Sequence, residues 1–448
     1  SFFISSIYIS VHLFKNNEWS LRIIPALFGI GGMVLIYYGV RKWLGKFESV
    51  GSLILFSFLP VLVAYSRELK QYTGDLFFAL LLIIISEYLL QRINRLYPWI
   101  ILALAGSVCL WFSFPIVFVL AAIGIITLWH TIHHIRNRNS GNVMGEYMPF
   151  LYWMTTFSLI MLSFVLLYFM IIRHQLSAGL ESYWHGGFPD LSGISPFFKW
   201  VILSIWSFFV YFWNGYAAIV IPFYILGIWE LYRTNKLRIL SYWSIIFILI
   251  LIASFFHTYP FGGDRTILFT APFFIILFIC GIKSAWRLSK DKLLWKPFAC
   301  IGILLLAVQV ADAAIYYKND SGYFWYTQYP RKQNIKSALF TLIEKRKDNE
   351  PLYVYYGGDL AFEYYSKYYF RNQFHPVYIG KIHRDNYPDY IYDMKPLIEK
   401  REPFWMVATH VDIRELSYIH KVIGNGFGYK GYVYFQNEGA FLVYYSTH

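Results

Sequence analysis

The chain has 448 residues, 57% of them hydrophobic and 15% charged, and its mean hydropathy is +0.44. Ordinary soluble domains do not carry so many long apolar runs, so these values exclude a soluble protein and favour a membrane protein. The net charge of +13 would suit nucleic-acid binding, but the distribution of the charges described below excludes that function.

Apolar runs follow one another along the first two thirds of the chain. Because runs of roughly 18 or more residues with few charges mark spanning helices, we expect about ten membrane spans. The runs are Leu21–Val40, Val50–Tyr65, Thr73–Leu90, Trp99–Phe114, Ile116–Leu128, Phe150–Ile172, Ala217–Trp229, Ile239–Phe256, Ile267–Ile282 and Phe298–Tyr316. The run Phe2–Phe14 is apolar but short.

The loops between these spans differ in charge. Alternate loops carry most of the basic residues, and cytoplasmic loops retain Lys and Arg, so we place this set inside. Those basic residues are Arg41, Lys42, Lys46, Arg92, Arg95, Arg136, Arg138, Arg233, Lys236, Arg238, Lys283, Arg287, Lys290, Lys292 and Lys296. Counting Phe197–Phe212 as a span would put the last basic loop outside, so we interpret it as an interfacial helix on the outer leaflet.

Residues 318–448 have shorter hydrophobic runs and more charges than the rest of the chain. Helical spacing over Asn334–Lys347 is followed by a strand-like run at Leu352–Tyr356 and a helix-like segment at Leu360–Tyr369. This alternation predicts a small α/β sandwich. With ten spans and basic loops inside, we expect residues 1–317 to form the membrane domain and residues 318–448 an extracytoplasmic domain.

The segment Ser66–Asp75 places four ionisable groups between two spans on the expected outer side. Such groups are costly to desolvate at the bilayer surface unless they pair or bind something. Arg67 and Lys70 suit a phosphate, whereas Glu68 and Asp75 suit a supporting role, accepting a proton or orienting a basic partner. The alternative is a solvated turn with local ion pairs.

Two further arginines lie at the same membrane height. Arg22 sits just inside the outer end of the first long span, where an arginine either snorkels to the interface or reaches an anionic head group. Arg265 opens another span after Gly262 and Gly263, which let the backbone approach a ligand closely. The alternative for the glycine pair is an ordinary flexible turn.

The outer loops also carry aromatic and histidine side chains. His257, Tyr259 and Trp184, in outer loops, are candidate substrate contacts, although most Tyr and Trp residues at span ends are interfacial anchors. No ligand cluster supports a metal site, and no cofactor is indicated. The three cysteines, Cys109, Cys280 and Cys300, lie in apolar spans and are interpreted as core residues.

These motifs, in this order, resemble bacterial members of the family-39-type glycosyltransferases, which include the protein O-mannosyltransferases. The matching segments are Arg22–Gly29, Ser66–Tyr72 with Asp75, Tyr259–Arg265 running into Ala271–Pro272, and the strand-like Pro351–Tyr356 and Phe404–His410. The resemblance covers nearly the whole chain.

The resemblance implies a polytopic α-helical membrane protein with the glycosyltransferase C fold and a small C-terminal α/β extracytoplasmic domain. It implies transfer of a hexosyl or pentosyl group from a polyprenyl-phosphate donor to a lipid, glycan or protein acceptor, on the outer face of the cell membrane. Arg22, Arg67, Lys70 and Arg265 would bind the donor phosphate. Relatives with and without a metal exist, so a divalent metal stays open.

The same family places a catalytic aspartate in the first outer loop. The sequence begins at Ser1 without a methionine or a basic leader, so we interpret it as a fragment that lacks this loop. The main base is expected upstream of Ser1, and the fragment is expected to be inactive.

Two other function classes remain as alternatives. A transporter or flippase of lipid-linked sugars would more often show charged or Gly/Pro-broken spans near the bilayer midplane. A non-catalytic membrane assembly protein would use its outer domain to bind partners.

Overall fold

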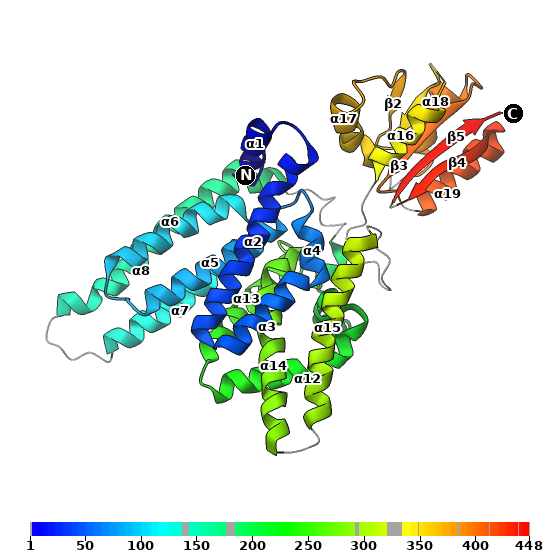
Figure 1. Ribbon diagram of the computed structural model, residues 1–448. Helices are drawn as coiled ribbons and strands as arrows, with labels where there is room; N and C mark the ends of the chain where they lie inside the picture. The colour runs from blue at the N-terminus through cyan, green and yellow to red at the C-terminus, as the bar shows by residue number, and fades with distance from the viewer. Residues whose placement is uncertain are drawn as a thin grey trace. The chain divides into compact units, whose positions relative to one another are not determined.

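A computed structural model describes residues 2–136, 143–175, 184–291, 295–319, 334–347, 349–383, 386–411, 413–437 and 439–447. The chain divides into two compact units, Ser1–Lys318 and Asn319–His448. Figure 1 shows a first unit built of helices and a second unit built around a sheet.

The described part of the first unit is helical throughout. Its longer helices are α1 (Phe2–Phe14), α2 (Glu18–Trp43), α3 (Lys46–Phe58), α4 (Pro60–Ser66), α5 (Tyr72–Leu90), α6 (Leu96–Phe112), α7 (Ile116–Arg136), α8 (Val143–Leu167), α11 (Ile194–Trp213), α12 (Ala217–Arg233), α13 (Leu237–Phe255), α14 (Ala271–Asp291) and α15 (Trp295–Asn319). Short helical turns extend or connect them at η1 (Tyr168–Ile172), α9 (Arg173–Gln175), η2 (His185–Gly187), η3 (Asn214–Tyr216) and η4 (Arg265–Thr270).

Eight helical segments of the described residues are long and apolar enough to cross a membrane, or nine if a bent pair counts as one span. The helix α6, with 17 residues, is slightly shorter, and it lies on one of the ten expected runs. Each of the other expected runs also falls on a helix. The expected multi-span α-helical architecture is therefore confirmed.

One expected span is broken. The run Val50–Tyr65 forms α3 and α4, which meet at a bend of 59°. Pro60 opens α4, and a proline has no backbone N–H and clashes with the preceding turn of a continuous helix. The bend gives α4 a direction of its own toward the turn that follows Ser66.

Glycines let two helices of the first unit approach closely. A Cβ at Gly227 of α12 would lie 2.1 Å from the carbonyl oxygen of Leu277 in α14, and a Cβ at Gly281 would lie 2.0 Å from that of Phe223. Small residues at such contacts allow backbone-to-backbone packing between membrane helices.

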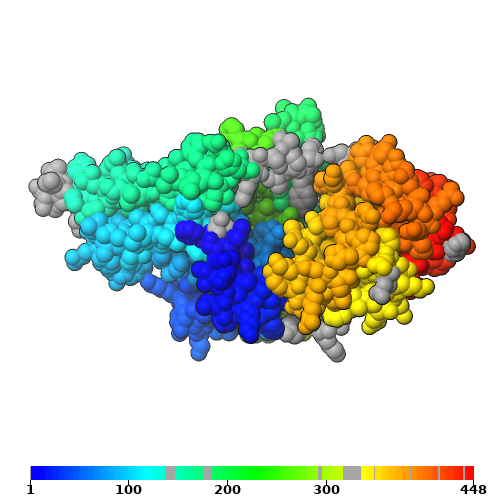
Figure 2. Space-filling view, turned by 90° about the horizontal axis from the view of Figure 1, so that it is seen from above, coloured from blue at the N-terminus to red at the C-terminus, as the bar shows by residue number. Residues whose placement is uncertain are grey.

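The space-filling view of Figure 2 shows α1 and the start of α2, in dark blue, on the face seen from above.

The second unit has a five-stranded sheet in the order β2-β1-β3-β5-β4. Its strands are β1 (Leu352–Val354), β2 (Val377–Ile379), β3 (Phe404–Thr409), β4 (Lys430–Asn437) and β5 (Ala440–Ser446). The first three are parallel, whereas β5 is antiparallel to both β3 and β4. Its helices are α16 (Ile335–Lys345), α17 (Asp359–Tyr368), α18 (Asp389–Ile398) and α19 (Ile413–Lys421), with short turns η5 (Tyr356–Gly358) and η6 (Val422–Gly426).

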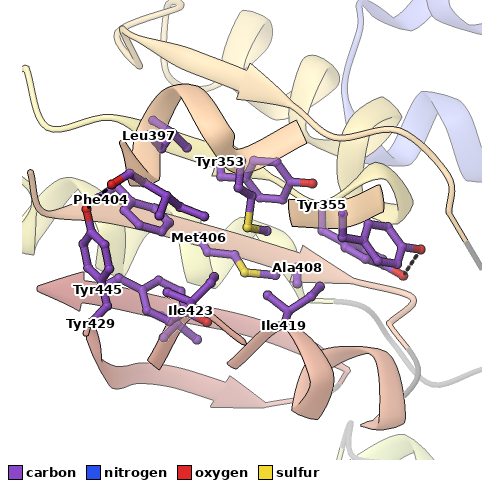
Figure 3. Close-up of a cluster of buried hydrophobic side chains, with 14 of the residues drawn as sticks. Tyr353, Tyr355, Leu397, Phe404, Met406, Ala408, Ile419, Ile423, Tyr429 and Tyr445 are labelled. Atoms are coloured by element: carbon purple, nitrogen blue, oxygen red, sulfur yellow. Dashed lines mark hydrogen bonds between the residues drawn. The ribbon is translucent and has the colours of Figure 1, made fainter. Parts of the chain in front are cut away.

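Helices cover both faces of this sheet. Alternate residues of a strand point to opposite faces, so Trp405 and Met406 of β3 enter two different cores. The core around Met406 takes side chains from α18 and α19 and appears in Figure 3. The core around Trp405 takes side chains from α16 and α17. The expected small α/β sandwich is therefore confirmed.

Candidate functional site

A tight turn connects α4 to α5 and carries three of the candidate residues. The backbone N–H of Arg67 donates to the carbonyl of Ala64 at 3.2 Å, and that of Lys70 donates to the carbonyl of Glu68 at 2.8 Å. Lys70 is exposed, whereas Arg67 and Glu68 are half-buried. The turn therefore presents a carboxylate flanked by two cations at one end of the helical bundle, which we call the turn end.

Glu68 is the electrostatic centre of the turn end. Burial raises the pKa of Glu68 above its ordinary value, and the positive charges of Lys70, Arg265 and Arg22 act in the opposite direction. Lys70 belongs to the same turn, but Arg22 and Arg265 come from two other elements. The fold thus brings Arg22, the turn and Arg265 together, although they lie far apart in the sequence.

The position of Arg22 is set by the start of α2. Asn17 caps this helix, since its side chain accepts a hydrogen bond from the backbone N–H of Ser20 at 2.9 Å. One turn further along, Thr73 of α5 donates its hydroxyl hydrogen to the carbonyl of Pro25 at 3.0 Å. This bond fixes the first turn of α5 against the first turns of α2, and with it the distance from Arg22 to the α4–α5 turn.

Arg265 is held by the loop that precedes η4. The Asp264 carboxylate accepts a hydrogen bond from the backbone N–H of Arg265, and its Oδ1 lies 3.9 Å from the Arg265 Nε. The Arg265 guanidinium also lies over the Trp184 ring, 5.3 Å from its centroid. Burial raises the pKa of Asp264, while the backbone N–H and the charge of Arg265 oppose this shift.

Asp75 lies deeper than the sequence suggested. It is 3% exposed and belongs to the first turn of α5, whereas we expected it in the surface turn. A carboxylate is favourable there because the helix N-terminus carries partial positive charge. Asp75 lies beside the Ser113 hydroxyl, and its Oδ1 has no hydrogen-bond partner among the described residues.

The three candidate substrate contacts have different surroundings. The Tyr259 hydroxyl donates to the carbonyl of Thr266 at 2.7 Å, so this residue braces the loop before η4. The exposed His257 ring stacks on Phe188 with centroids 4.7 Å apart. Trp184, in contrast, lines an open groove and touches Arg265.

That groove has a volume of about 350 Å³ and lies beside Arg265, which packs over Trp184. It is formed by the turn that contains Trp184, by α11 and by the loop before η4, and we call it the Trp184 groove. Its lining residues are Trp184, Gly186, Gly187, Trp200, Leu203, Ser204, Ser207, Pro260, Gly262, Gly263, Asp264 and Thr266.

Sequence reasoning missed the contribution of α11, which we expected only as an interfacial helix. Trp200, Ser204 and Ser207 recur at helical spacing and line the groove together. Two serines on one face of an otherwise apolar helix were the available signal. The helix reaches the groove because Ser207 accepts a hydrogen bond from the backbone N–H of Gly263 at 2.6 Å.

A metal site is not apparent at the turn end. Within the described ranges, no three side chains of His, Cys, Asp or Glu type gather closely enough to hold a metal ion.

Residues 3–168 match the sequence model of the family described as dolichyl-phosphate-mannose-protein mannosyltransferase. This segment contains Arg22 and the whole α4–α5 turn, but not Arg265. No curated protein sequence matches the chain.

Two solved membrane-protein structures are similar in fold. ArnT from Cupriavidus metallidurans bound to undecaprenyl phosphate aligns with 99% of this chain and 87% of its own, at 12% identity and a TM-score of 0.52. The apo oligosaccharyltransferase of Archaeoglobus fulgidus aligns with 98% of this chain and 65% of its own, at 12% identity and a TM-score of 0.50. At such identities the likeness is one of fold.

Proposed function

The chain has the fold of the glycosyltransferase C superfamily, and from this premise we propose that it transfers a sugar from a polyprenyl-phosphate donor to an acceptor. The group transferred is a hexosyl or pentosyl unit, and the acceptor is a lipid, a glycan or a protein. The site is the turn end together with the Trp184 groove beside it.

One observation carries this proposal: the positive charges of Lys70, Arg265 and Arg22 all act on the half-buried Glu68. A polyprenyl phosphate gains negative charge as the glycosidic bond breaks, so fixed cations stabilise the transition state more than the ground state. The turn end lies where helices begin and end, which is the level at which a lipid carrier presents its phosphate while its tail stays in the bilayer.

The acids at this end have supporting roles in the proposal. Glu68 holds Arg22, Lys70 and Arg265 near one another, since its charge is the common counter-ion of the three. Asp75 supports the floor of the site from the first turn of α5. Arg67, half-buried in the same turn, adds a further positive charge at the phosphate.

We further propose that the turn end faces away from the cytoplasm in the cell membrane. The opposite ends of the same helices lead into the loops that are rich in Lys and Arg. Such basic loops are typical of the cytoplasmic side of a membrane protein. This orientation makes residues 1–317 the transfer domain and residues 318–448 an extracytoplasmic domain. A reporter fused after residue 317 tests it, because a reporter that works only in the cytoplasm should stay inactive there.

The enzymatic proposal is tested by turnover of a polyprenyl-phosphate sugar by the full-length protein. Arg67→Ala, Lys70→Ala and Arg265→Ala should each lower the rate by about a hundredfold, because each removes a charge-assisted contact to phosphate. Arg95→Ala, at an exposed cation on the opposite end of the bundle, is the matched control and should keep the wild-type rate. Near-normal rates in all three folded variants would place the phosphate elsewhere.

A further inference from the structure

The walls of the Trp184 groove are tied to one another by hydrogen bonds. The backbone N–H of Phe261 donates to the carbonyl of Gly187 at 2.8 Å. The Trp200 Nε1–H donates to the carbonyl of Gly186 at 3.2 Å, and Ser207 accepts from the backbone of Gly263. The groove is therefore built by three segments that hold each other in place.

Two of its four glycines are required by packing. A Cβ at Gly187 would lie 2.5 Å from the Cβ of Pro260, and a Cβ at Gly263 would lie 1.9 Å from the carbonyl oxygen of Ser207. Real side chains do not approach so closely, so these two positions exclude any larger residue without a shift of the backbone.

The other two glycines have room for a side chain. At Gly262 the nearest atom to an added Cβ is the Ser207 Oγ at 3.6 Å, and at Gly186 no atom of the described residues lies within 4 Å, its chain neighbours aside. Neither glycine has a positive φ angle. Neither packing nor backbone conformation therefore requires a glycine at position 186 or 262. The absence of a side chain at these two positions keeps the groove open.

The groove lining combines aromatic rings with oxygen atoms. Trp184 and Trp200 supply the rings, and Asp264, Ser207 and Thr266 supply hydroxyl and carboxylate oxygens. The Thr266 Oγ1 is buried and has no hydrogen-bond partner among the described residues. A sugar ring has apolar C–H faces and a rim of hydroxyl groups, so it matches both parts of this lining.

Size and charge narrow the class of ligand. A volume of about 350 Å³ lies near the lower end of ligand pockets, roughly 300–1,000 Å³, which suits one sugar ring better than an oligosaccharide. Asp264 is the charged side chain among the described lining residues. Its carboxylate repels an acidic sugar such as a uronic acid.

We propose that the Trp184 groove is the subsite for the donor sugar, and that it accepts a single neutral ring. The Arg265 guanidinium, 5.3 Å from the centre of the Trp184 ring, sets a phosphate at the mouth of the groove. A sugar bonded to that phosphate lies within one ring's width of it, which is inside the groove. This inference rests on the proposed function.

The test fills the groove without disturbing its walls. An added Cβ meets no atom of the described residues within 4 Å at Gly186 and only an ordinary contact, 3.6 Å to the Ser207 Oγ, at Gly262, so Gly186→Leu and Gly262→Leu add a side chain to the groove. Gly193→Leu is the matched control, because Gly193 is exposed, lies outside the groove lining and has its nearest atom, Pro196 Cδ, at 3.5 Å. Binding to the purified full-length protein is measured for undecaprenyl phosphate alone and for the same lipid bearing glucose, mannose, xylose or glucuronic acid.

The wild-type protein and Gly193→Leu should bind at least one neutral-sugar lipid about tenfold more tightly than bare undecaprenyl phosphate, and should show no such gain for glucuronic acid. Gly262→Leu and Gly186→Leu should lose this gain and keep their affinity for the bare lipid within about twofold.

Two results would overturn the proposed subsite but not the proposed function. In the first, Gly262→Leu and Gly186→Leu still bind the sugar-bearing lipid more tightly than bare undecaprenyl phosphate. In the second, their affinity for the bare lipid falls as much as their affinity for the sugar-bearing lipid. Absence of binding of every lipid to the wild-type protein would instead refute the proposed function, and this subsite with it.

Discussion

The two ends of the helical unit both contain carboxylates and cations, but they arrange them differently. At the end opposite to the turn end, Glu87 pairs with Arg238 at 3.1 Å, and Glu230 pairs with Arg287 at 3.0 Å. Glu48 pairs with Lys283 there as well. These three acids are 3–8% exposed, and each has a cation in direct contact. We call this end the paired end.

At the turn end, several cations lie near one half-buried carboxylate. Glu68 is near Lys70, Arg265 and Arg22, and Asp264 lies 3.9 Å from Arg265. Ion pairs in direct contact neutralise each other and stabilise a fold, whereas cations gathered around one half-buried carboxylate keep positive potential for an anion. Helix ends of similar composition therefore differ in how their charges are arranged, with direct ion pairs at one end and several cations near a single half-buried carboxylate at the other.

The largest expected effect is on stability at the paired end. Lys283→Met leaves Glu48 buried without its cation, so the free energy of unfolding should fall by about 3–5 kcal/mol. Chemical unfolding in detergent micelles measures it. Lys290→Met, exposed on the same helix, is the control and should change little. Adding Glu48→Gln to Lys283→Met should restore most of the loss; no recovery would contradict the ion-pair explanation.

Arg265→Ala, at the turn end, should lower turnover strongly and stability only slightly. We expect turnover to fall about a hundredfold, because a contact to the leaving phosphate is lost. The free energy of unfolding should change by less than about 1 kcal/mol, since Arg265 is partly exposed. Rates and unfolding curves are measured on the same preparation. A loss of stability as large as that of Lys283→Met would remove the distinction between the two ends.

Asp75→Asn tests the buried carboxylate of the turn end. Because its Oδ1 has no hydrogen-bond partner among the described residues, the amide should leave the free energy of unfolding unchanged or raise it. Turnover should fall roughly tenfold, since the negative charge near Tyr72 and Tyr259 is lost. Destabilisation comparable to that of Lys283→Met would show that the Asp75 carboxylate stabilises the fold, as the acids of the paired end do.

The smallest expected effect is a pH dependence at Glu68. Burial raises the pKa of Glu68 above its ordinary value of 4.5, so the folded protein binds more protons than the unfolded chain in that window. Stability contributed by the protonated group is therefore lost as pH rises from 4.5 through the raised pKa. Glu68→Gln should make this decline shallower, whereas Glu399→Gln, at an exposed residue, should not. Identical slopes in wild type and Glu68→Gln would contradict the prediction.

Much of the helical architecture could be predicted because hydropathy is a local property. The run Thr73–Leu90 and the helix α5 (Tyr72–Leu90) agree within one residue, and β3 (Phe404–Thr409) lies within the strand-like segment Phe404–His410. The break of Val50–Tyr65 at Pro60 is also encoded locally, but an apolar count alone does not detect it. The local signal for the break is the proline inside this apolar run, because a proline cannot continue the hydrogen bonding of the preceding helix.

The candidate site could be predicted only in part. The sequence identified Arg22, Arg67, Lys70 and Arg265 as cations at one membrane height, and family-like motifs drew attention to the same positions. It did not identify α11 as a wall of the Trp184 groove, because the role of Ser207 depends on a hydrogen bond to Gly263 in another segment. Its placement of Asp75 at the surface was wrong, since the start of α5 at Tyr72 carries that residue inside.

The sequence by itself determined which segments are apolar enough to cross a membrane and where charged residues interrupt them, because the cost of placing each side chain in lipid depends on that segment alone. Only the tertiary structure decided that the charges of Arg22 and Arg265 act on Glu68, and that Gly262 lines the Trp184 groove. These outcomes depend on how α2, α5, α11 and η4 pack, through contacts such as Thr73 to Pro25. Packing between distant segments is a property of the whole fold, and no local pattern contains it.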